Sequence, residues 1–309
     1  MTPRFVLAAV CWLAVVSPVL AQQRPLATED PETIGAGRLL IEGGVDAAHD
    51  VSYPVSGLKG NLWRVPTIGI SVGISSIAEL QIDGGLYDSL SITSRNPGAP
   101  LASLLTVTGD STHSFEDTII ATKIRLLSES TGRPAIGVRF ATKLPNATNE
   151  SGLGLDTTDF FASLLGAKTV ESIRVVANIG VGILADPTNG NRQNDVLTYG
   201  LSFARAMTQH TEVVGELNGR LSVREGDPFP GTESRGLLNL GGRYTQGPVR
   251  FDAGVFLGLT TIDPTIGMTP WRKMLNSSRY LKKYSEKLDR LVMVYTTIKA
   301  TVNNSPISP

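Results

Sequence analysis

The sequence is poor in the features that mark most enzymes and helical membrane proteins. It contains a single cysteine, Cys11, and only three histidines, His49, His113 and His210. The histidines are too widely spaced to suggest a metal site. Beyond residue 21 no stretch approaches the roughly 18 consecutive apolar residues that indicate a membrane-spanning helix. The sequence therefore predicts no metal, no cofactor and no transmembrane helix.

The first residues have the pattern of a secretory signal peptide. Arg4 precedes an apolar run over residues 5–16, Pro18 ends the run, and small residues precede a cleavage site after Ala21. The alternative, a membrane anchor, fits less well because the run is shorter than the ~20 residues that a spanning helix needs. Because Cys11 lies within the signal, the mature chain is expected to have no thiol and no disulfide.

What the chain does contain is apolar alternation with period two, together with 32 glycines. In one segment Ile173, Val175 and Ala177 alternate with Arg174 and Asn178, which predicts a strand with one apolar and one polar face. Segments of this kind run to about 9–11 residues in membrane barrels but nearer 5–6 in soluble proteins. The sequence predicts eleven such strands, over residues 38–45, 62–74, 79–87, 117–126, 136–144, 160–168, 173–183, 197–203, 212–221, 235–244 and 249–259.

The connections between these segments alternate in length. Long connections are expected at residues 46–61, 88–116, 144–158, 186–193 and 224–233, and short ones at 75–78, 128–133, 169–172, 207–210 and 246–248. This rhythm is typical of an antiparallel up-and-down transmembrane β-barrel, with short periplasmic turns and long external loops. A soluble sandwich or soluble closed barrel remains an alternative, because alternation alone does not distinguish lipid from a shared core.

Bacterial single-chain barrels have even strand numbers, so a twelfth strand is expected after Asp263-Pro264. It begins at Ile266 and is predicted to stop at Pro270, since proline removes a donor from the ladder. The remaining residues, 271–309, contain no glycine, eight basic and two acidic residues, and apolar residues at helical spacing. They are interpreted either as a basic helical tail on anionic lipid or as a tail foreign to the barrel, from a changed reading frame.

The predicted organisation is therefore a signal peptide (1–21), an N-terminal extension (22–33), an outer-membrane all-β barrel of about twelve strands (34–270) and the tail (271–309).

No residue is assigned a catalytic role. Asp110, Ser111 and His113 lie close together, but the partners of a catalytic triad usually come from separate elements. The glycines alternate within strands or lie in turns and form no phosphate-binding loop. Neither the acidic body nor the tail favours nucleic acid. The protein is not expected to be an enzyme.

Charged residues on the polar face of the strands are the best candidates for function. They are predicted to line the lumen, where their field selects solutes. Alternatively they neutralise one another and fill a narrow interior, because buried charges are unfavourable unless paired or hydrated. The predicted pore-lining residues are Arg38, Glu42, Glu79, Asp83, Lys123, Arg125, Arg139, Lys143, Arg174, Glu212, Glu216, Arg220, Arg235, Arg243, Arg250 and Asp252.

Short motifs in the middle of the chain resemble a known group. Lys143-Leu144-Pro145, Gly152-Leu153-Gly154, Asp156-Thr157-Thr158-Asp159 and Phe160-Phe161 are similar to the strand–loop–strand signature of the barrel family named for the MetA pathway of phenol degradation, over roughly residues 34–268. The resemblance implies an outer-membrane barrel that moves small, often aromatic or hydrophobic compounds. The family closes with an aromatic-ended strand, whereas this chain ends at Pro309.

The sequence thus predicts passive or weakly selective passage of small solutes across the outer membrane. The expected partners are outer-membrane lipid, the barrel-assembly machinery and an unidentified small solute. Two alternatives stay open: a non-transporting structural or surface barrel with a charge-plugged lumen, and a soluble periplasmic binding barrel. Detergent dependence separates the last from the others, and single-channel conductance separates the first two.

Overall fold

The computed structural model describes residues 26–277. The predicted signal peptide and residues 278–309 of the predicted tail lie outside the described residues. Within residues 26–277, no helix has the length and apolar character needed to cross a membrane.

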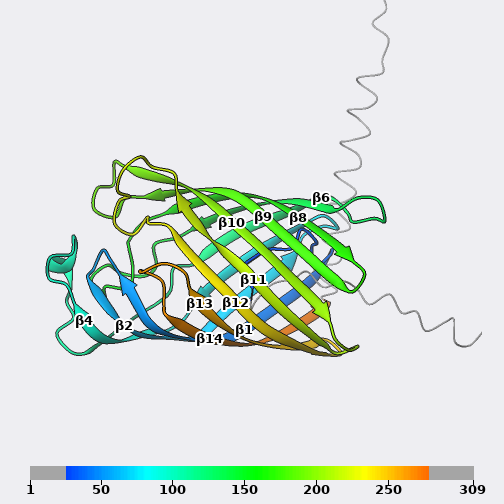
Figure 1. Ribbon diagram of the computed structural model, residues 1–309, viewed down its shortest axis with the longest axis horizontal. Helices are drawn as coiled ribbons and strands as arrows, with labels where there is room; N and C mark the ends of the chain where they lie inside the picture. Colours follow the sequence, from blue (N-terminus) through cyan, green and yellow to red (C-terminus); the bar gives the residue numbers. More distant parts are fainter. Residues whose placement is uncertain (1–25, 278–309) are drawn as a thin grey trace, which may run out of the picture.

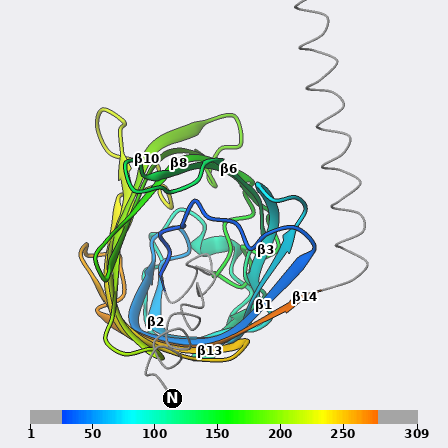
Figure 2. The ribbon, with the colours of Figure 1, turned by 90° about the vertical axis from the view of Figure 1, so that its right-hand side faces the viewer.

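The described chain forms one closed antiparallel β-barrel of twelve strands (Figures 1 and 2). Each strand pairs with its neighbours along the chain, and β1 pairs with both β2 and β14, which closes the ring. The strands are β1 (Arg38–Tyr53), β2 (Leu58–Gly73), β3 (Ala78–Gly85), β6 (Ile119–Leu127), β7 (Ala135–Lys143), β8 (Asp159–Val170), β9 (Ile173–Ala185), β10 (Gln193–Ala206), β11 (Thr211–Ser222), β12 (Arg235–Gln246), β13 (Val249–Gly258) and β14 (Ile266–Ser277).

Two further strands and a short 3-10 helix (Ala102–Leu104) lengthen one side of the barrel. Both β3 and β4 (Asp88–Arg95) pair with the same edge of β2. Residues 67–73 of β2 pair with β3, and residues 58–64 of β2 pair with β4. The strand β5 (Ser111–Ser114) pairs with β4 in turn. Figure 1 shows β2 and β4 reaching past the body of the barrel at its left end.

Two predicted long loops are therefore strand for much of their length. The segment predicted as a loop at 46–61 contains the ends of β1 and β2, which a four-residue turn (54–57) joins, and the segment at 88–116 contains β4 and β5. Bulges in β1, between Gly44 and Asp46 and between Ala48 and Val51, disrupt the period-two signal there without ending the ladder. Most of the remaining connections keep the predicted rhythm, but the turn between β6 and β7 (128–134) is as long as the loops at 186–192 and 259–265.

The two faces of the wall differ as the alternation predicts. Large apolar side chains such as Phe140, Leu240 and Val255 are exposed on the outside, whereas Lys123 and Arg243 are buried within the ring. An apolar outer face is the face that a membrane barrel presents to lipid.

The assignment of one face to residues 62–74 is wrong in part. Leu62 is buried inside the barrel, while Trp63 and Val65 are exposed. After Pro66 the alternation of buried and exposed residues is displaced by one residue, so that Thr67 is buried and Ile68 lies on the outer side. Because side chains alternate strictly along a strand, one irregular residue exchanges the two faces for all that follow.

The predicted end of the last strand at Pro270 is also wrong. Strand β14 runs to Ser277 and pairs with β13 and β1. Pro270 lies opposite Ala253 on one side, and on the other the ladder with β1 is interrupted between Gly44 and Ala47. A proline is tolerated where its partner strand bulges, because no donor is needed there. Residues 271–277 thus belong to the barrel rather than to the tail.

Candidate functional site: the barrel interior

The interior of the barrel holds all sixteen predicted pore-lining residues. Every one lies on a strand, and none of them is exposed. Five of these side chains line an internal cavity of about 590 Å³. The five are Glu42, Asp83, Arg139, Arg220 and Arg235. Most of the others form ion pairs along the inner wall, and Glu216 accepts hydrogen bonds from backbone N–H groups.

One network joins β1, β13 and β14 where the barrel closes. Lys273 forms an ion pair with Glu42, and both side chains are almost fully buried. Asp252 lies 3.0 Å from Arg250 Nε and 3.6 Å from Arg243 Nε. Arg243 Nη1 also lies 3.6 Å from Glu212, so three cations share three carboxylates along this part of the wall. This agrees with the expectation that interior charges neutralise one another.

A segment that the sequence did not place crosses the interior. We call Leu26–Ile34 the N-terminal segment; Figure 2 shows it, in dark blue, inside the ring of strands. The Glu216 carboxylate accepts hydrogen bonds from the backbone N–H groups of Ala27 and Thr28. Asn178 accepts from the N–H of Glu29 at 2.6 Å and donates to its carbonyl oxygen at 2.8 Å. The backbone of the N-terminal segment thus forms hydrogen bonds with side chains of β9 and β11.

Acidic side chains fix the same segment to cations of the wall. Glu29 lies 3.3 Å from Lys123 Nζ, Glu32 pairs with Arg125, and Asp30 pairs with Arg174. The sequence held one signal for this arrangement: Glu29, Asp30 and Glu32 are three acidic residues within four positions. Their charge is complementary to the inward arginine and lysine side chains. Lys123, Arg125 and Arg174 thus hold the N-terminal segment against the wall.

Arg174 also contacts the turn between β7 and β6. Its Nη1 lies 2.9 Å from Glu129, which accepts a further hydrogen bond from the backbone N–H of Thr169 at 2.7 Å. Burial acts to raise the pKa of the Glu129 carboxyl, but the hydrogen bonds from Thr169 and Arg174 outweigh it and hold that pKa below its ordinary value.

Two glycines make room for the N-terminal segment. A Cβ atom on Gly200 would lie 2.7 Å from Thr28 Oγ1, and one on Gly137 would lie 3.0 Å from the Cβ of Pro31. Any larger residue at Gly200 would therefore displace Thr28 or strain the wall. The wall of the barrel fits the segment sterically as well as electrostatically.

The cavity of about 590 Å³ and a second one of about 310 Å³ both touch this segment. Glu29 and Ala27 line both of them, as do Arg139 and Asn218 from the wall. The segment thus divides the interior instead of filling it. Both cavities contain polar and apolar lining residues, since Phe256 and Trp271 line the larger one and Phe161 the smaller.

The end of the barrel with the long loops is covered by an apolar cluster. Val51, Leu58, Leu62 and Leu90 are buried together, and Leu105 and Leu153 from two loops pack against them. The loops are also tied down by hydrogen bonds. The hydroxyl of Ser56 donates to Gly152 O at 2.8 Å, and that of Thr112 donates to Ser151 O at 2.7 Å.

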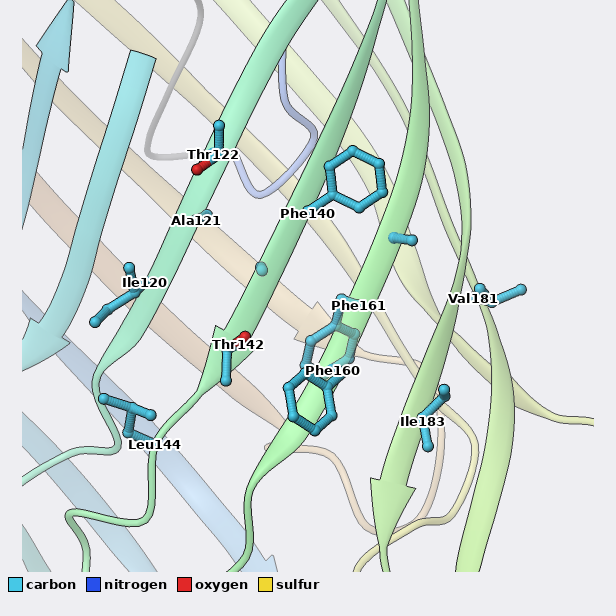
Figure 3. A pocket seen from close by; sticks show the side chains of 12 residues that line it. Ile120, Ala121, Thr122, Phe140, Thr142, Leu144, Phe160, Phe161, Val181 and Ile183 are labelled. Carbon is cyan, nitrogen blue, oxygen red and sulfur yellow. The ribbon is translucent and has the colours of Figure 1, made fainter. Parts of the chain in front are cut away.

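An apolar groove of about 500 Å³ lies over strands β6 to β9 (Figure 3). Phe140 and Phe160 stand out from it, with Ile120, Val181 and Ile183 around them. These side chains are exposed and belong to the outer face of the wall. The groove is therefore a feature of the outer face of the barrel rather than of the interior.

Two of the histidines make contacts of other kinds. His113 lies on β5 and stacks on Tyr87, with ring centroids 5.6 Å apart. The ring of His210 bonds to Thr245 O. Within residues 26–277 no cluster of three or more potential metal ligands occurs.

Comparison with known proteins identifies relatives by fold alone. No family model and no curated protein matches the sequence. The structure is similar to the crystal structure of the COG4313 outer membrane channel from Pseudomonas putida F1, with a TM-score of 0.58, 11% identity, and coverage of 80% of this chain and 98% of that one. The two proteins share a fold.

Two other solved barrels are more distantly similar. The NanC porin has a TM-score of 0.46 at 6% identity, covering 78% of this chain and 99% of its own. The Pseudomonas putida toluene transporter TodX has a TM-score of 0.36 at 12% identity, covering 80% and 91%.

Proposed function

We propose that the protein is an outer-membrane channel for passive or weakly selective passage of small solutes. The observation that carries this proposal is a closed barrel with an apolar exterior, whose interior keeps a cavity of about 590 Å³ lined by charged side chains. A barrel of this pattern is stable in lipid because closure of the ring pairs the backbone groups of neighbouring strands and leaves no open edge. After signal removal near Ala21, the barrel-assembly machinery inserts the chain into outer-membrane lipid.

The N-terminal segment sets the width of the pathway under this proposal. It divides the interior between the two cavities and is held by several charge-assisted hydrogen bonds, which are stronger than neutral ones. Solutes pass beside the segment while it is in place, and through a wider lumen when it leaves. The motif resemblance and the apolar side chains of Phe256 and Trp271 support small aromatic or hydrophobic compounds among these solutes.

A structural barrel without transport is the second candidate. It is favoured by the extent of charge pairing, such as Lys123 with Glu79 at 3.0 Å and Lys273 with Glu42, and by the segment itself. The exposed apolar exterior argues against the third alternative, a soluble periplasmic barrel, since large contiguous apolar surfaces are rare on soluble monomers.

Single-channel recording in planar bilayers tests the proposal. The full-length mature protein should give discrete current steps. A variant in which residues 26–34 are replaced by a Gly/Ser stretch of equal length should give larger steps, because the segment's anchors are gone while the chain length is kept. The matched control replaces residues 187–191 of the β9–β10 loop in the same way and should leave the step size unchanged.

Absence of steps from both the mature protein and the 26–34 variant, with both folded by heat-modifiability on gels, would overturn the proposal in favour of a structural barrel. Steps from the variant alone would overturn the claim that solutes pass beside the bound segment.

A further inference from the structure

Two arginines face each other on the inner wall near the end with the long loops. Arg220 of β11 and Arg235 of β12 are direct register partners, and both line the larger cavity. Like charges directly opposite one another on neighbouring antiparallel strands repel. An arrangement of this kind is unfavourable unless a negative group lies between or beside the two guanidinium groups.

Carboxylates lie near the pair, since Glu233, Asp159 and Asp263 all attract Arg220, but within residues 26–277 none is in ion-pair contact with either guanidinium group. Arg220 donates from Nε to Glu233 O at 2.9 Å and from Nη2 to Gly231 O at 2.8 Å, so its protein partners are backbone carbonyls. The Nε atom of Arg235 is buried and has no acceptor. Among residues 26–277, neither side chain forms an ion pair with a carboxylate.

Asp263 and Asp159 are engaged by other groups, whereas Glu233 keeps one oxygen that is buried without a hydrogen-bond partner. Asp263 Oδ2 accepts hydrogen bonds from the backbone N–H of Gly236 at 2.9 Å and from the hydroxyl of Thr260 at 2.7 Å. Asp159 lies 3.1 Å from Lys143 Nζ. One oxygen of Glu233 accepts from the backbone N–H of Gly231, at 2.9 Å.

Other cations of the same cavity are paired. Arg64 Nε lies 3.4 Å from Asp88, and Arg139 Nη2 lies 3.9 Å from Asp83. Arg64 and Arg139 thus have carboxylate partners in this cavity, whereas Arg220 and Arg235 have none in ion-pair contact. The difference indicates that the pair Arg220–Arg235 is open to an anion from outside the protein.

An apolar wall adjoins this pair. Leu237 lies two residues from Arg235 on β12 and therefore points to the same side of the strand. Phe256 of the neighbouring strand β13 and Trp271 of β14 line the same cavity. The cavity thus combines two unpaired cations with aromatic and aliphatic surface, which fits a molecule that has a negative group and an apolar body.

We propose that Arg220 and Arg235 together bind the carboxylate of a small organic acid whose apolar part lies against Leu237 and Phe256. Arginine presents its donors in a planar fork that matches a carboxylate, and two such groups satisfy both oxygens. This proposal rests on the proposed function, since it names the class of solute that the channel takes, and it makes the pair a specificity-determining site of the pathway.

Calorimetric titration of the folded full-length protein in detergent tests the site. Benzoate should bind saturably to the parent protein, and at least tenfold more weakly to the double variant R220Q/R235Q. Benzyl alcohol, which has the same ring without the charge, should bind both proteins equally. The matched control R133Q/R205Q removes two exposed arginines at the opposite end of the barrel and should bind benzoate like the parent.

A charge-retaining variant separates geometry from net charge. R220K/R235K keeps both positive charges without the planar fork, so its benzoate affinity should fall between those of the parent and R220Q/R235Q. If R220Q/R235Q shows no heat-modifiable folded form on gels, the single variants R220Q and R235Q are measured instead. Each should weaken benzoate binding. Equal benzoate affinity in the parent and in these glutamine variants would overturn the proposal.

The remaining outcomes separate the two proposals. Absence of benzoate binding to a parent protein that gives current steps in bilayers overturns the site and leaves the channel. Benzoate binding that depends on the pair, in a protein without current steps, overturns the channel and leaves the site. Acetate that binds as tightly as benzoate overturns the role assigned to Leu237 and Phe256.

Discussion

Lys123 Nζ lies 3.0 Å from a carboxylate oxygen of Glu79, and both side chains are completely buried. The two residues are opposite each other on β6 and β3, and Glu29 of the N-terminal segment lies 3.3 Å from the same amine. Removing one member of a buried pair leaves an uncompensated charge, which typically costs about 3–5 kcal/mol.

Lys123→Met should therefore lower the free energy of unfolding by about 3–5 kcal/mol. Lys123→Met combined with Glu79→Met should recover only part of that loss, because Glu29 and the backbone N–H of Ile34 still lose a partner. Urea unfolding of the barrel in detergent, followed by tryptophan fluorescence, measures both. A single variant as stable as the parent would show that the pair is hydrated and not truly buried.

The orientation of β12 is tested at Leu240, which is exposed on the outer face and lies opposite Val255. Leu240→Arg should destabilise the protein in a lipid bilayer by about 2–4 kcal/mol, because the charge faces hydrocarbon near mid-membrane. The control Leu240→Phe keeps the apolar face and should fold like the parent. If Leu240→Arg and Leu240→Phe fold equally well in bilayers, the outer face of β12 does not meet lipid.

The side of the membrane on which the long loops lie is tested by cysteine labelling. Ser94→Cys and Asn149→Cys should react with an impermeant thiol reagent on intact cells, because a first strand that starts in the periplasm places these positions outside. Ser130→Cys lies in a turn at the other end and should react only after the cells are lysed. Labelling of Ser130→Cys alone on intact cells would reverse the topology.

The closing strand makes a prediction about truncation. A chain that ends at Ser277 keeps all of β14 and should fold to a heat-modifiable barrel in the same yield as the full chain. A chain that ends at Pro270 loses Trp271 and Lys273, which are both buried, and exposes the edge of β1 over that length. Unpaired backbone groups in lipid each cost several kcal/mol, so this chain should not insert. Equal yields would show that β1 closes on β13 directly.

Much of the wall could be predicted from the sequence. Each strand has one buried and one exposed face, so apolar and polar residues alternate along it with period two. Strands such as β9 and β12 agree with the predicted segments 173–183 and 235–244 to within two residues at each end. The charged residues of these strands were correctly placed on the buried face for the same reason. Alternation does not predict the faces of a strand where both faces are covered or where a bulge shifts the pattern. This is the case at Leu62, at Pro66 and in the second half of β1.

The interior was harder to predict, because its contacts join residues far apart in the sequence. Nothing local to Glu29 or Asp30 shows that Lys123 and Arg174 will lie beside them. Similarly, Pro270 reads as a strand end by itself and is accommodated only because β1 bulges opposite it. The open pair of Arg220 and Arg235 could be predicted to lie in the lumen, but its lack of carboxylate partners depends on the whole surrounding wall.

The seam between β1 and β14 has a consequence for the order of folding. Asp46 of β1 accepts hydrogen bonds from Thr269 Oγ1 at 2.6 Å and from Trp271 Nε1 at 3.3 Å, across a separation of more than two hundred residues. The first strand is therefore synthesised long before its second partner exists, and one of its edges stays unpaired until β14 has been made. Unpaired edges invite pairing with other chains. We therefore expect aggregation of the chain to be favoured until β14 pairs with β1.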